Sequence, residues 1–462
     1  MRSIRLVTVT SMALSNGNLG SVLSAAASGG LLAFTGRMAM LGTGFAVNVL
    51  LARLLLPSEL GSYYLVQSIA AAGGVAAVCG MDQALVRLIA ESRASGREGR
   101  ARDAITKALV FSAAGCAVFG GAILLGVGRW LAASVFEEPM IGQVAHLAAI
   151  WLVIIAFRRL MADGFRGFHN IGLASLFGGA LGGALTALGL SLVFMVQGRC
   201  DLSEALWVTI GASGLSLGIG YALFLGTKVA SLGSGGALHS KELLRLGIPL
   251  WLIYLMSFVM TQSDLWIVAG FRSSEEVAIY GAAARLVQLI VLPIAVVDVA
   301  LAPLIARMWR QTRQQDLEKV LRTAATLAGI PALLMLVACA VASKSLLEAV
   351  FGEYFGGGAS ILVLLSIGQL AVVLTGPCGS ALMMMGHQRT MMNITLTCGV
   401  GVVVGSIAVA RDWGATGVAS VMSGGLITQN LTMLLAAKMK TGVWTHVGVR
   451  PVAEAFKEWR GR

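Results

Sequence analysis

The sequence predicts an all-α integral membrane protein of about twelve transmembrane helices, arranged as two pseudo-symmetric six-helix lobes around a central cavity. The composition excludes a soluble domain, because 57% of the 462 residues are hydrophobic and 12% are charged. Most apolar stretches have about the length, roughly 20 residues, that a helix needs to cross a hydrocarbon core of about 30 Å. The stretches are 31–52, 62–82, 108–128, 144–162, 171–196, 205–226, 247–270, 279–304, 324–343, 360–385, 393–410 and 414–437.

Lysine and arginine alternate between the loops and predict an orientation. Of the 34 basic residues, 26 belong to the N-terminus, the connections after even-numbered stretches and the C-terminal tail, and six belong to the opposite loops; Arg158 and Arg159, at the end of stretch 144–162, are counted with the connection that follows it. The remaining two, Arg37 and Arg285, fall inside stretches. Because basic loops are retained in the cytoplasm, both termini are predicted to be cytoplasmic. The net charge of +12 follows from this bias, so an anionic membrane surface is the expected counterpart, and nucleic acid is not.

An internal match divides the chain into two halves. Pro57-Ser-Glu-Leu-Gly-Ser-Tyr63 aligns with Ser274-Glu-Glu-Val-Ala-Ile-Tyr280, each after the first apolar stretch of its half. Six spans is an even number, so the halves share one orientation, and transporters commonly bind substrate between such repeats. The predicted segments are a cytoplasmic N-terminal segment 1–27, an N-lobe 28–227, a cytoplasmic linker 228–245, a C-lobe 246–437 and a cytoplasmic tail 438–462.

Charged residues inside the stretches mark the candidate site, since one at the bilayer centre costs about 2.5–3.5 kcal/mol on insertion scales. Arg37 could extend to the interface or face the cavity and bind an anion. Asp264 and Arg285 lie at similar depth, roughly 12–14 Å from the outward mouth at 1.5 Å per residue. They could form a structural ion pair, or a site where substrate phosphate competes for Arg285 and Asp264 takes up a proton. The repeat places Asn48 and Gln67 at equivalent depths in the first half.

Two further carboxylates near the cytoplasmic ends of spans are expected to pair with nearby arginines: Asp298 with Arg307, and Asp163 with Arg158, Arg159 or Arg166.

Motifs for catalysis or cofactors are not found in the sequence. The chain has no phosphate-binding Gly-x-x-x-x-Gly-Lys-Ser/Thr loop, no His-Glu-x-x-His and no Cys-x-x-Cys pair, and its five histidines are scattered. We therefore expect no catalytic residues, no metal and no cofactor, and an enzyme is disfavoured.

The order of several short motifs resembles the polysaccharide (O-antigen type) flippases of the multidrug/oligosaccharidyl-lipid/polysaccharide exporter superfamily over nearly the whole chain. Leu56 replaces the usual glycine of the first motif, a departure at a loop position. The motifs are Leu51-Ala-Arg-Leu-Leu-Leu-Pro-Ser-Glu-Leu-Gly-Ser-Tyr63, Cys79-Gly-Met-Asp-Gln-Ala-Leu-Val-Arg87, Gly164-Phe-Arg-Gly-Phe-His-Asn170, Leu246-Gly-Ile-Pro249, Asp264 with Val277-Ala-Ile-Tyr-Gly-Ala-Ala-Ala-Arg285, Val350-Phe-Gly-Glu-Tyr354 and Gly414-Ala-Thr-Gly417.

The resemblance implies a flippase that moves a polyprenyl-diphosphate-linked oligosaccharide across a bacterial inner membrane, with two lobes rocking around a cationic cavity. Its expected partners are this substrate, membrane lipids, a polysaccharide polymerase and a chain-length regulator. A guanidinium offers bidentate pairing to a diphosphate. The predicted substrate-binding residues are Arg37 and Arg285 for the diphosphate, Asp264 for orientation or ion coupling, and Asn48, Gln67 and Gln288 for sugar hydroxyls.

Three alternatives compete with this interpretation. A drug/cation antiporter of the same superfamily would carry acidic residues along the first lobe, where spans one to six have no carboxylate away from their ends. The lipid II flippase usually has two further spans. A membrane-embedded glycan-transferring enzyme is the third alternative, and the short outward loops argue against it.

Overall fold

The computed structural model describes residues 19–229, 238–312 and 314–448, and this part of the chain is helical with no β-strand. The first 18 residues of the predicted N-terminal segment, the glycine-rich part of the predicted linker and the tail from residue 449 lie outside the described residues. The first described helix begins at Leu19, within the range predicted as the N-terminal segment.

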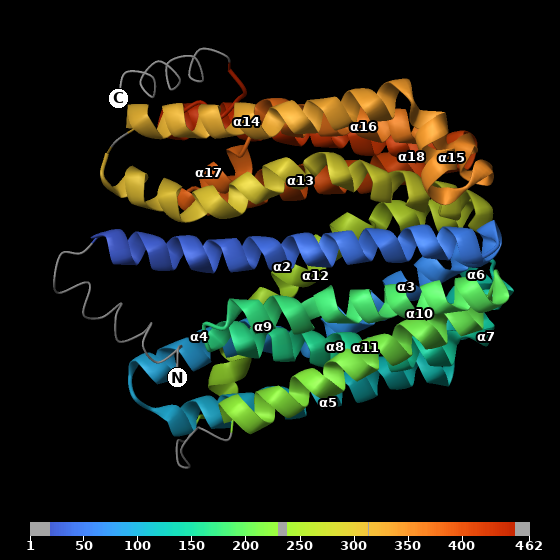
Figure 1. Cartoon of the computed structure of the whole chain (residues 1–462), viewed down its shortest axis with the longest axis horizontal. Helices are drawn as coiled ribbons and strands as arrows, with labels where there is room; N and C mark the ends of the chain where they lie inside the picture. Colours follow the sequence, from blue (N-terminus) through green and yellow to red (C-terminus); the bar gives the residue numbers. More distant parts are fainter. Residues whose placement is uncertain (1–18, 230–237, 313, 449–462) are drawn as a thin grey trace.

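Two groups of helices lie one above the other in Figure 1. Helix α2 belongs to the first group and lies along the boundary between the two. The first group is α2 (Leu19–Leu54), α3 (Pro57–Val78), α4 (Met81–Ala94), α5 (Glu98–Ala122), η1 (Ile123–Val127), α6 (Gly128–Ser134), α7 (Pro139–Gln143), α8 (Ala145–Gly167), α9 (Ile171–Ser175), η2 (Leu176–Ala180), α10 (Leu181–Gln197), α11 (Leu202–Phe224) and η3 (Leu225–Val229). The second is α12 (Ser240–Phe271), α13 (Ser274–Arg310), α14 (Gln314–Val341), α15 (Ser343–Phe351), η4 (Glu353–Gly358), α16 (Ala359–Thr375), α17 (Cys378–Met384) and α18 (Gln388–Thr441).

Ten helices of the described chain are long and apolar enough to span a membrane, or eleven if α3 and α4 form one span bent by 45°. The bend follows from Cys79 and Gly80, which both have positive φ. The 54-residue α18 holds two of the predicted spans, because Gly414 breaks it with φ 58° and ψ −149°. Its halves are antiparallel neighbours, since a Cβ at Gly425 would lie 2.0 Å from Val402. With this division the twelve predicted spans are all accounted for.

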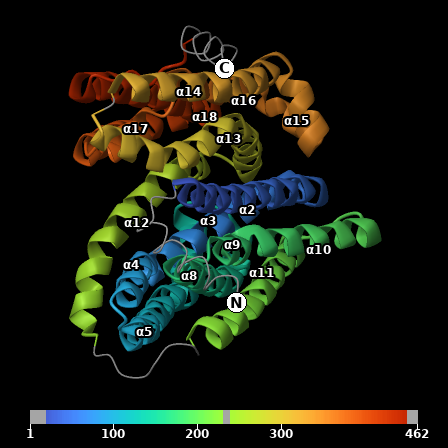
Figure 2. The same cartoon turned by 60° about the vertical axis from the view of Figure 1, so that its left-hand side comes forward.

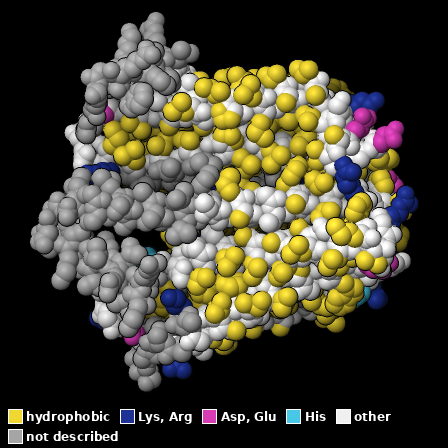
Figure 3. All heavy atoms as spheres, viewed as in Figure 1, with side chains coloured by type: hydrophobic (Ala, Val, Ile, Leu, Met, Phe, Trp, Pro, Cys, Tyr) yellow, Lys and Arg dark blue, Asp and Glu magenta, His cyan; other side chains and the backbone are white. Residues whose placement is uncertain are grey.

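The two ends of the bundle differ in charge. We call the end with Arg87, Arg166 and Arg310 the basic end, on the left in Figure 1, and the end with Arg53 and Arg272 the opposite end. Figure 3 shows hydrophobic side chains across the middle of one face and charged side chains towards its ends. This distribution is the one expected for a bilayer-spanning bundle.

Helix α12 joins the two groups and runs along both of them in Figure 2. Its start contacts the first group, where a Cβ at Gly80 would lie 2.2 Å from the Gly247 carbonyl oxygen. Arg100 also forms an ion pair with Glu242 at the beginning of α12. The helix thus begins within the range predicted as a linker and ties the lobes together near the basic end.

At the opposite end the lobes touch directly through α3 and α13. A Cβ at Gly61 would lie 1.9 Å from the Ser274 carbonyl oxygen, so only glycine permits this approach. Ser274 also donates to Glu138, and Arg53 donates to the carbonyls of Ala349 and Val350. These contacts close the space between the lobes at this end.

Candidate functional site: a cationic cavity between the lobes

A cavity of about 280 Å³ lies where α2, α3, α12 and α13 meet, nearer the opposite end than the basic end of α12 and α13. It brings together five of the six residues predicted as a binding site, although they come from four separate helices. These are Asn48, Gln67, Asp264, Arg285 and Gln288. The sixth, Arg37, lines an adjoining cavity described below.

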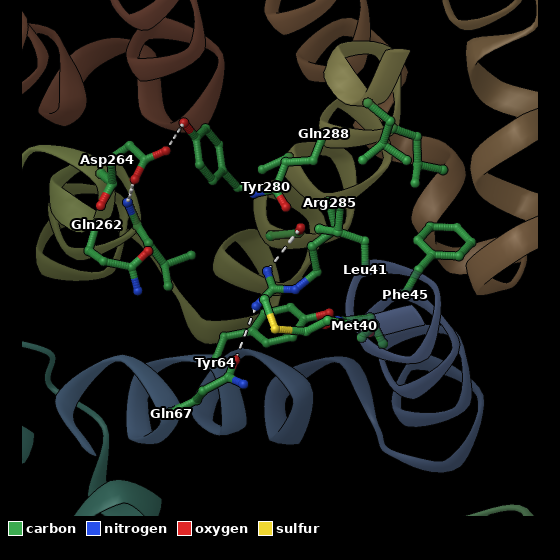
Figure 4. A pocket seen from close by; sticks show the side chains of 18 residues that line it. Met40, Leu41, Phe45, Tyr64, Gln67, Gln262, Asp264, Tyr280, Arg285 and Gln288 are labelled. Atoms are coloured by element: carbon green, nitrogen blue, oxygen red, sulfur yellow. Dashed lines mark hydrogen bonds between the residues drawn. The ribbon is translucent and has the colours of Figure 1, made fainter. Parts of the chain in front are cut away.

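Arg285 crosses from the C-lobe to the N-lobe in this cavity (Figure 4). Its guanidinium lies 3.6 Å from the ring centroid of Tyr64 and donates to Gln67 Oε1 at 3.3 Å and to the Gly281 carbonyl at 3.1 Å. No described carboxylate lies within ion-pair distance of it. The cation is therefore held by an aromatic face and neutral oxygens, which leaves its charge available to a ligand.

Asp264 has a different partner from the one considered in the sequence analysis. Its Oδ2 accepts a hydrogen bond from the Tyr280 hydroxyl at 2.9 Å, and its Oδ1 accepts from the Leu265 backbone amide. Figure 4 shows the carboxylate turned towards Tyr280 rather than Arg285. The structural ion pair between Asp264 and Arg285 is thus not formed, because a tyrosine from α13 occupies the carboxylate.

The three neutral candidates, Asn48, Gln67 and Gln288, differ in the hydrogen bonds that they already make within the protein. Asn48 donates to the Gly44 carbonyl of its own helix at 2.7 Å, and Gln67 is bonded to Arg285. Gln288 is exposed in the cavity wall. The Tyr64 hydroxyl is buried and has no hydrogen-bond partner among the described residues. Free donors therefore remain at Tyr64 and Gln288 beside the cation.

A larger cavity of about 860 Å³ adjoins the first one and extends to the basic end. Its wall includes Trp151 and Thr209 at one level and Arg37, Gln83 and Arg166 towards the basic end. The two cavities adjoin, because they share lining residues from three helices: Met40, Leu41, Gly44, Asn48, Gln67 and Gln262.

Four arginines line the larger cavity, and two of them are neutralised by carboxylates. Arg166 pairs with Asp163, which confirms one of the predicted pairings, and Gln83 also donates to Asp163. Arg159 pairs at 2.9 Å with Asp82, a carboxylate with 3% exposure. The other two cavity arginines are Arg37 and Arg158.

The position of the arginine pair in α8 and the partner of Asp298 differ from the sequence prediction. Arg158 and Arg159 were grouped with the connection after the fourth span, but both lie inside α8, more than two turns before its end at Gly167. Asp298 was expected to pair with Arg307. Arg307 is instead exposed, and the Asp298 carboxyl interacts with Ser380 and with the charge of Arg37.

The family model for polysaccharide biosynthesis proteins matches residues 50–357, more than half of the chain. The chain belongs to this family. The match covers α3 to α15 completely and therefore includes Gln67, Asp264, Arg285 and Gln288. No curated protein matches the chain significantly by sequence.

Solved structures show that this family member has the fold of the MOP superfamily. An inward-facing structure of a multidrug resistance MATE family transporter aligns with TM-score 0.72 and 15% identity, covering 89% of this chain and 98% of that one. An outward-facing structure of such a transporter gives TM-score 0.62 and 15% identity, covering 90% and 95%. A MOP superfamily transporter from Pyrococcus furiosus, described as having a binding pocket of reversed polarity, aligns with TM-score 0.59 and 15% identity, covering 90% of this chain and 95% of that one.

The sequence of this polysaccharide biosynthesis protein did not suggest a role in the cavities for Tyr64, Tyr280 or Arg158, all of which line them. Tyr280 was used only as half of the repeat match with Tyr63, yet both hydroxyls form hydrogen bonds with polar residues of other helices, Tyr280 with Asp264 and Tyr63 with Thr209 at 3.0 Å. Tyr64 follows Tyr63 directly. The repeat was therefore a usable signal for the tyrosines, whereas the orientation of Arg158 had no such signal.

Proposed function

We propose that the protein is a flippase that moves polyprenyl-diphosphate-linked oligosaccharide across the bacterial inner membrane for polysaccharide biosynthesis. The observation that carries the proposal is the guanidinium of Arg285. It faces a cavity inside the bundle, between the two lobes, without a carboxylate partner among the described residues. Membership in the polysaccharide biosynthesis family supplies the glycan context.

The physical reason is the high free energy of an uncompensated charge in the bilayer. A cation within a span is costly unless it has a counter-charge or faces water. Arg285 has neither an acidic partner nor a position in the lipid-facing surface. A diphosphate meets the complementary difficulty, because it cannot cross hydrocarbon without compensation. The two costs are offset when the guanidinium binds the diphosphate by two parallel hydrogen bonds.

The larger cavity provides the space that the attached sugars require. Its volume of about 860 Å³ lies near the upper end of ordinary ligand pockets, about 300–1,000 Å³. It reaches the basic end, which we assign to the cytoplasm by the distribution of basic loops. Contacts through Gly61, Ser274 and Arg53 close the opposite end. We therefore take this state as the one that loads substrate from the cytoplasm, and rocking of the lobes as the step that exposes it to the periplasm.

Asp264 is the candidate for ion coupling in the same cavity. Its carboxylate is held by Tyr280 and is not neutralised by Arg285, so a proton can exchange on it without breaking an ion pair. Asp264→Asn keeps the shape and the hydrogen bond from Tyr280 but removes the charge. We expect this variant to flip substrate at a rate that no longer responds to an imposed proton gradient. An unchanged response would exclude Asp264 as the coupling group.

The drug/cation antiporter remains the second candidate and makes a different electrostatic demand. A cationic substrate would need a free carboxylate in the N-lobe part of the cavity. Asp82 and Asp163 are each paired with an arginine there. The larger cavity is thus positively charged in the described part of the chain, which favours an anionic substrate.

An export assay in a strain that lacks this gene tests the proposal. Complementation with the wild-type gene should restore surface polymer, and the deletion should accumulate the lipid-linked unit inside. The Arg285→Ala gene should fail to complement, whereas Arg129→Ala, which removes an exposed arginine outside both cavities, should complement fully. Normal polymer in the deletion strain, or full complementation by both variants, would contradict the proposal.

A further inference from the structure

We infer that Arg158, with Arg37 on another wall of the same cavity, forms a second anion-binding subsite between Arg285 and the basic end of the cavity. The inference rests on the proposed function for the identity of the natural ligand, but its chemistry can be tested alone. It assigns to Arg158 a role for which the sequence suggested only an interfacial ion pair.

Arg158 is a cavity residue whose charge is not compensated. It lines the larger cavity, its Nε is buried without a hydrogen-bond partner, and the structure records no ion pair for it with any described residue. The adjacent Arg159 adds a like charge, although that guanidinium is engaged by Asp82. A half-buried guanidinium with unused donors beside a hydrated cavity is a ready site for an anion.

Arg37 approaches the same region from α2. A Cβ at Gly36 would lie 2.4 Å from Ser175 Cβ, and one at Gly178 would lie 3.3 Å from Ala162 Cβ. These contacts make α2, the α9–η2 segment and α8 consecutive walls of one space. Arg37 is exposed to that space. The guanidinium groups of Arg37 and Arg158 therefore line one space, from the walls formed by α2 and α8.

The subsite is separate from Arg285 along the axis of the bundle. Arg285 stacks on Tyr64, and the neighbouring Tyr63 contacts Trp151 with 5.7 Å between ring centroids. Trp151 therefore marks the level of the Arg285 guanidinium on α8. Seven residues, about 10 Å at 1.5 Å per residue, separate Trp151 from Arg158. An anion that enters from the basic end passes Arg158 before it reaches Arg285.

The acidic groups nearby leave this subsite positive. Asp163 and Asp82 are engaged by Arg166 and Arg159. The charge of Asp298 on α13 acts on Arg37 without an ion pair between them, and one buried oxygen of Asp298 has no hydrogen-bond partner among the described residues. Asp298 therefore compensates Arg37 in part, and Arg158 supplies the principal free charge.

The ligand chemistry is an anionic group that accepts two hydrogen bonds from a guanidinium. The diphosphate of the lipid headgroup fits best, because it must travel from the basic end to Arg285 and a second cation on that route lowers the cost of the passage. A carboxylate on an acidic sugar is the other source of the same chemistry. It would occupy the Arg158 subsite while the diphosphate rests on Arg285.

Isothermal titration calorimetry of the purified full chain with inorganic pyrophosphate tests whether the Arg158 subsite binds a diphosphate. We expect two equivalents for the wild type, one for Arg158→Gln and one for Arg285→Gln, and two for the control Arg389→Gln, whose exposed arginine lines neither cavity. At its own subsite each cavity variant should weaken binding by about tenfold to a hundredfold.

Glucuronate serves as the probe for the other possible ligand, the carboxylate of an acidic sugar. Glucuronate binding that requires Arg158, together with one equivalent of pyrophosphate, would support the subsite and assign it to an acidic sugar. One equivalent of pyrophosphate that is unaffected by Arg158→Gln, without glucuronate binding, would overturn the inference. These outcomes do not depend on polymer export, so the subsite can fail while the export assay succeeds, and the reverse.

Discussion

Replacement of Arg285 by alanine should remove most of the affinity for a prenyl diphosphate. A guanidinium has five N–H donors, and the structure uses one for Gln67 and one for Gly281. Nε and one hydrogen on each terminal nitrogen stay free, which is enough for a bidentate contact with a phosphate. Charge-assisted hydrogen bonds are worth about 1.5–3 kcal/mol each, so we expect a loss of about 3 kcal/mol, or about a hundredfold.

The assay is calorimetric binding of farnesyl diphosphate, a short soluble prenyl diphosphate, to the chain in lipid nanodiscs. Measuring it in the Arg158→Gln background leaves the Arg285 site to be counted alone. Arg285→Lys should lie between wild type and alanine, because lysine keeps the charge but loses the planar fork. If the alanine variant is folded by gel filtration and circular dichroism and binds within threefold of the parent, the assignment of Arg285 to the diphosphate is wrong.

Three further predictions concern the scaffold and its ends. Arg159→Ala should destabilise the protein by about 3 kcal/mol, because it leaves the buried Asp82 without its cation. Arg87→Ala should destabilise it by about 1 kcal/mol or less, because both partners of its ion pair are largely exposed. Thermal unfolding in detergent measures both changes. Gly61→Ala should separate the lobes at the opposite end or cost about 1–3 kcal/mol, as seen in unfolding or in cross-linking of engineered cysteines. Burial raises the pKa of the Cys200 thiol to about 11, so its labelling by an impermeant maleimide should be slow at pH 7 and rise about tenfold per pH unit below that pKa.

The ion-pair and glycine predictions each have a control variant, and all three predictions have an outcome that would contradict them. Asp82→Asn should restore part of the stability lost in Arg159→Ala, and no restoration would show that the pair does not matter. Gly211→Ala is the match for the glycine change, because no atom lies within 4 Å of its Cβ position. Equal effects of the two glycine changes would contradict the close approach of α3 to α13. Rapid labelling of Cys200 at pH 7 would contradict its burial.

The positions of the membrane spans could be predicted from the sequence, because the thickness of the bilayer sets the length of every apolar stretch that crosses it. The depth of the polar residues could be predicted as well, since a fixed rise per residue converts sequence distance into depth. Asn48, Gln67, Asp264, Arg285 and Gln288 line one cavity for this reason. Breaks inside helices were harder, because Gly80 and Gly414 bend the chain through backbone angles that many other glycines in spans do not adopt.

Side-chain partners could not be obtained in the same way. Adjacent helical residues point about 100° apart, and the sequence does not give the rotation of α8 against α4. Arg159 therefore meets Asp82 while Arg158 faces the cavity, although both arginines were equally good candidates for Asp163. Similarly, equal depth suggested an ion pair between Asp264 and Arg285, but the rotation of α13 presents Tyr280 to the carboxylate.

The central claim is that the cationic cavity carries a diphosphate-linked glycan across the bilayer. Transbilayer movement of a fluorescent polyprenyl-diphosphate-linked oligosaccharide in proteoliposomes tests it most directly. The account predicts that the wild-type chain accelerates this movement over protein-free vesicles and that Arg285→Ala does not, while Arg389→Ala behaves as wild type. Equal rates for the wild type and empty vesicles, or for the wild type and Arg285→Ala, would contradict the account.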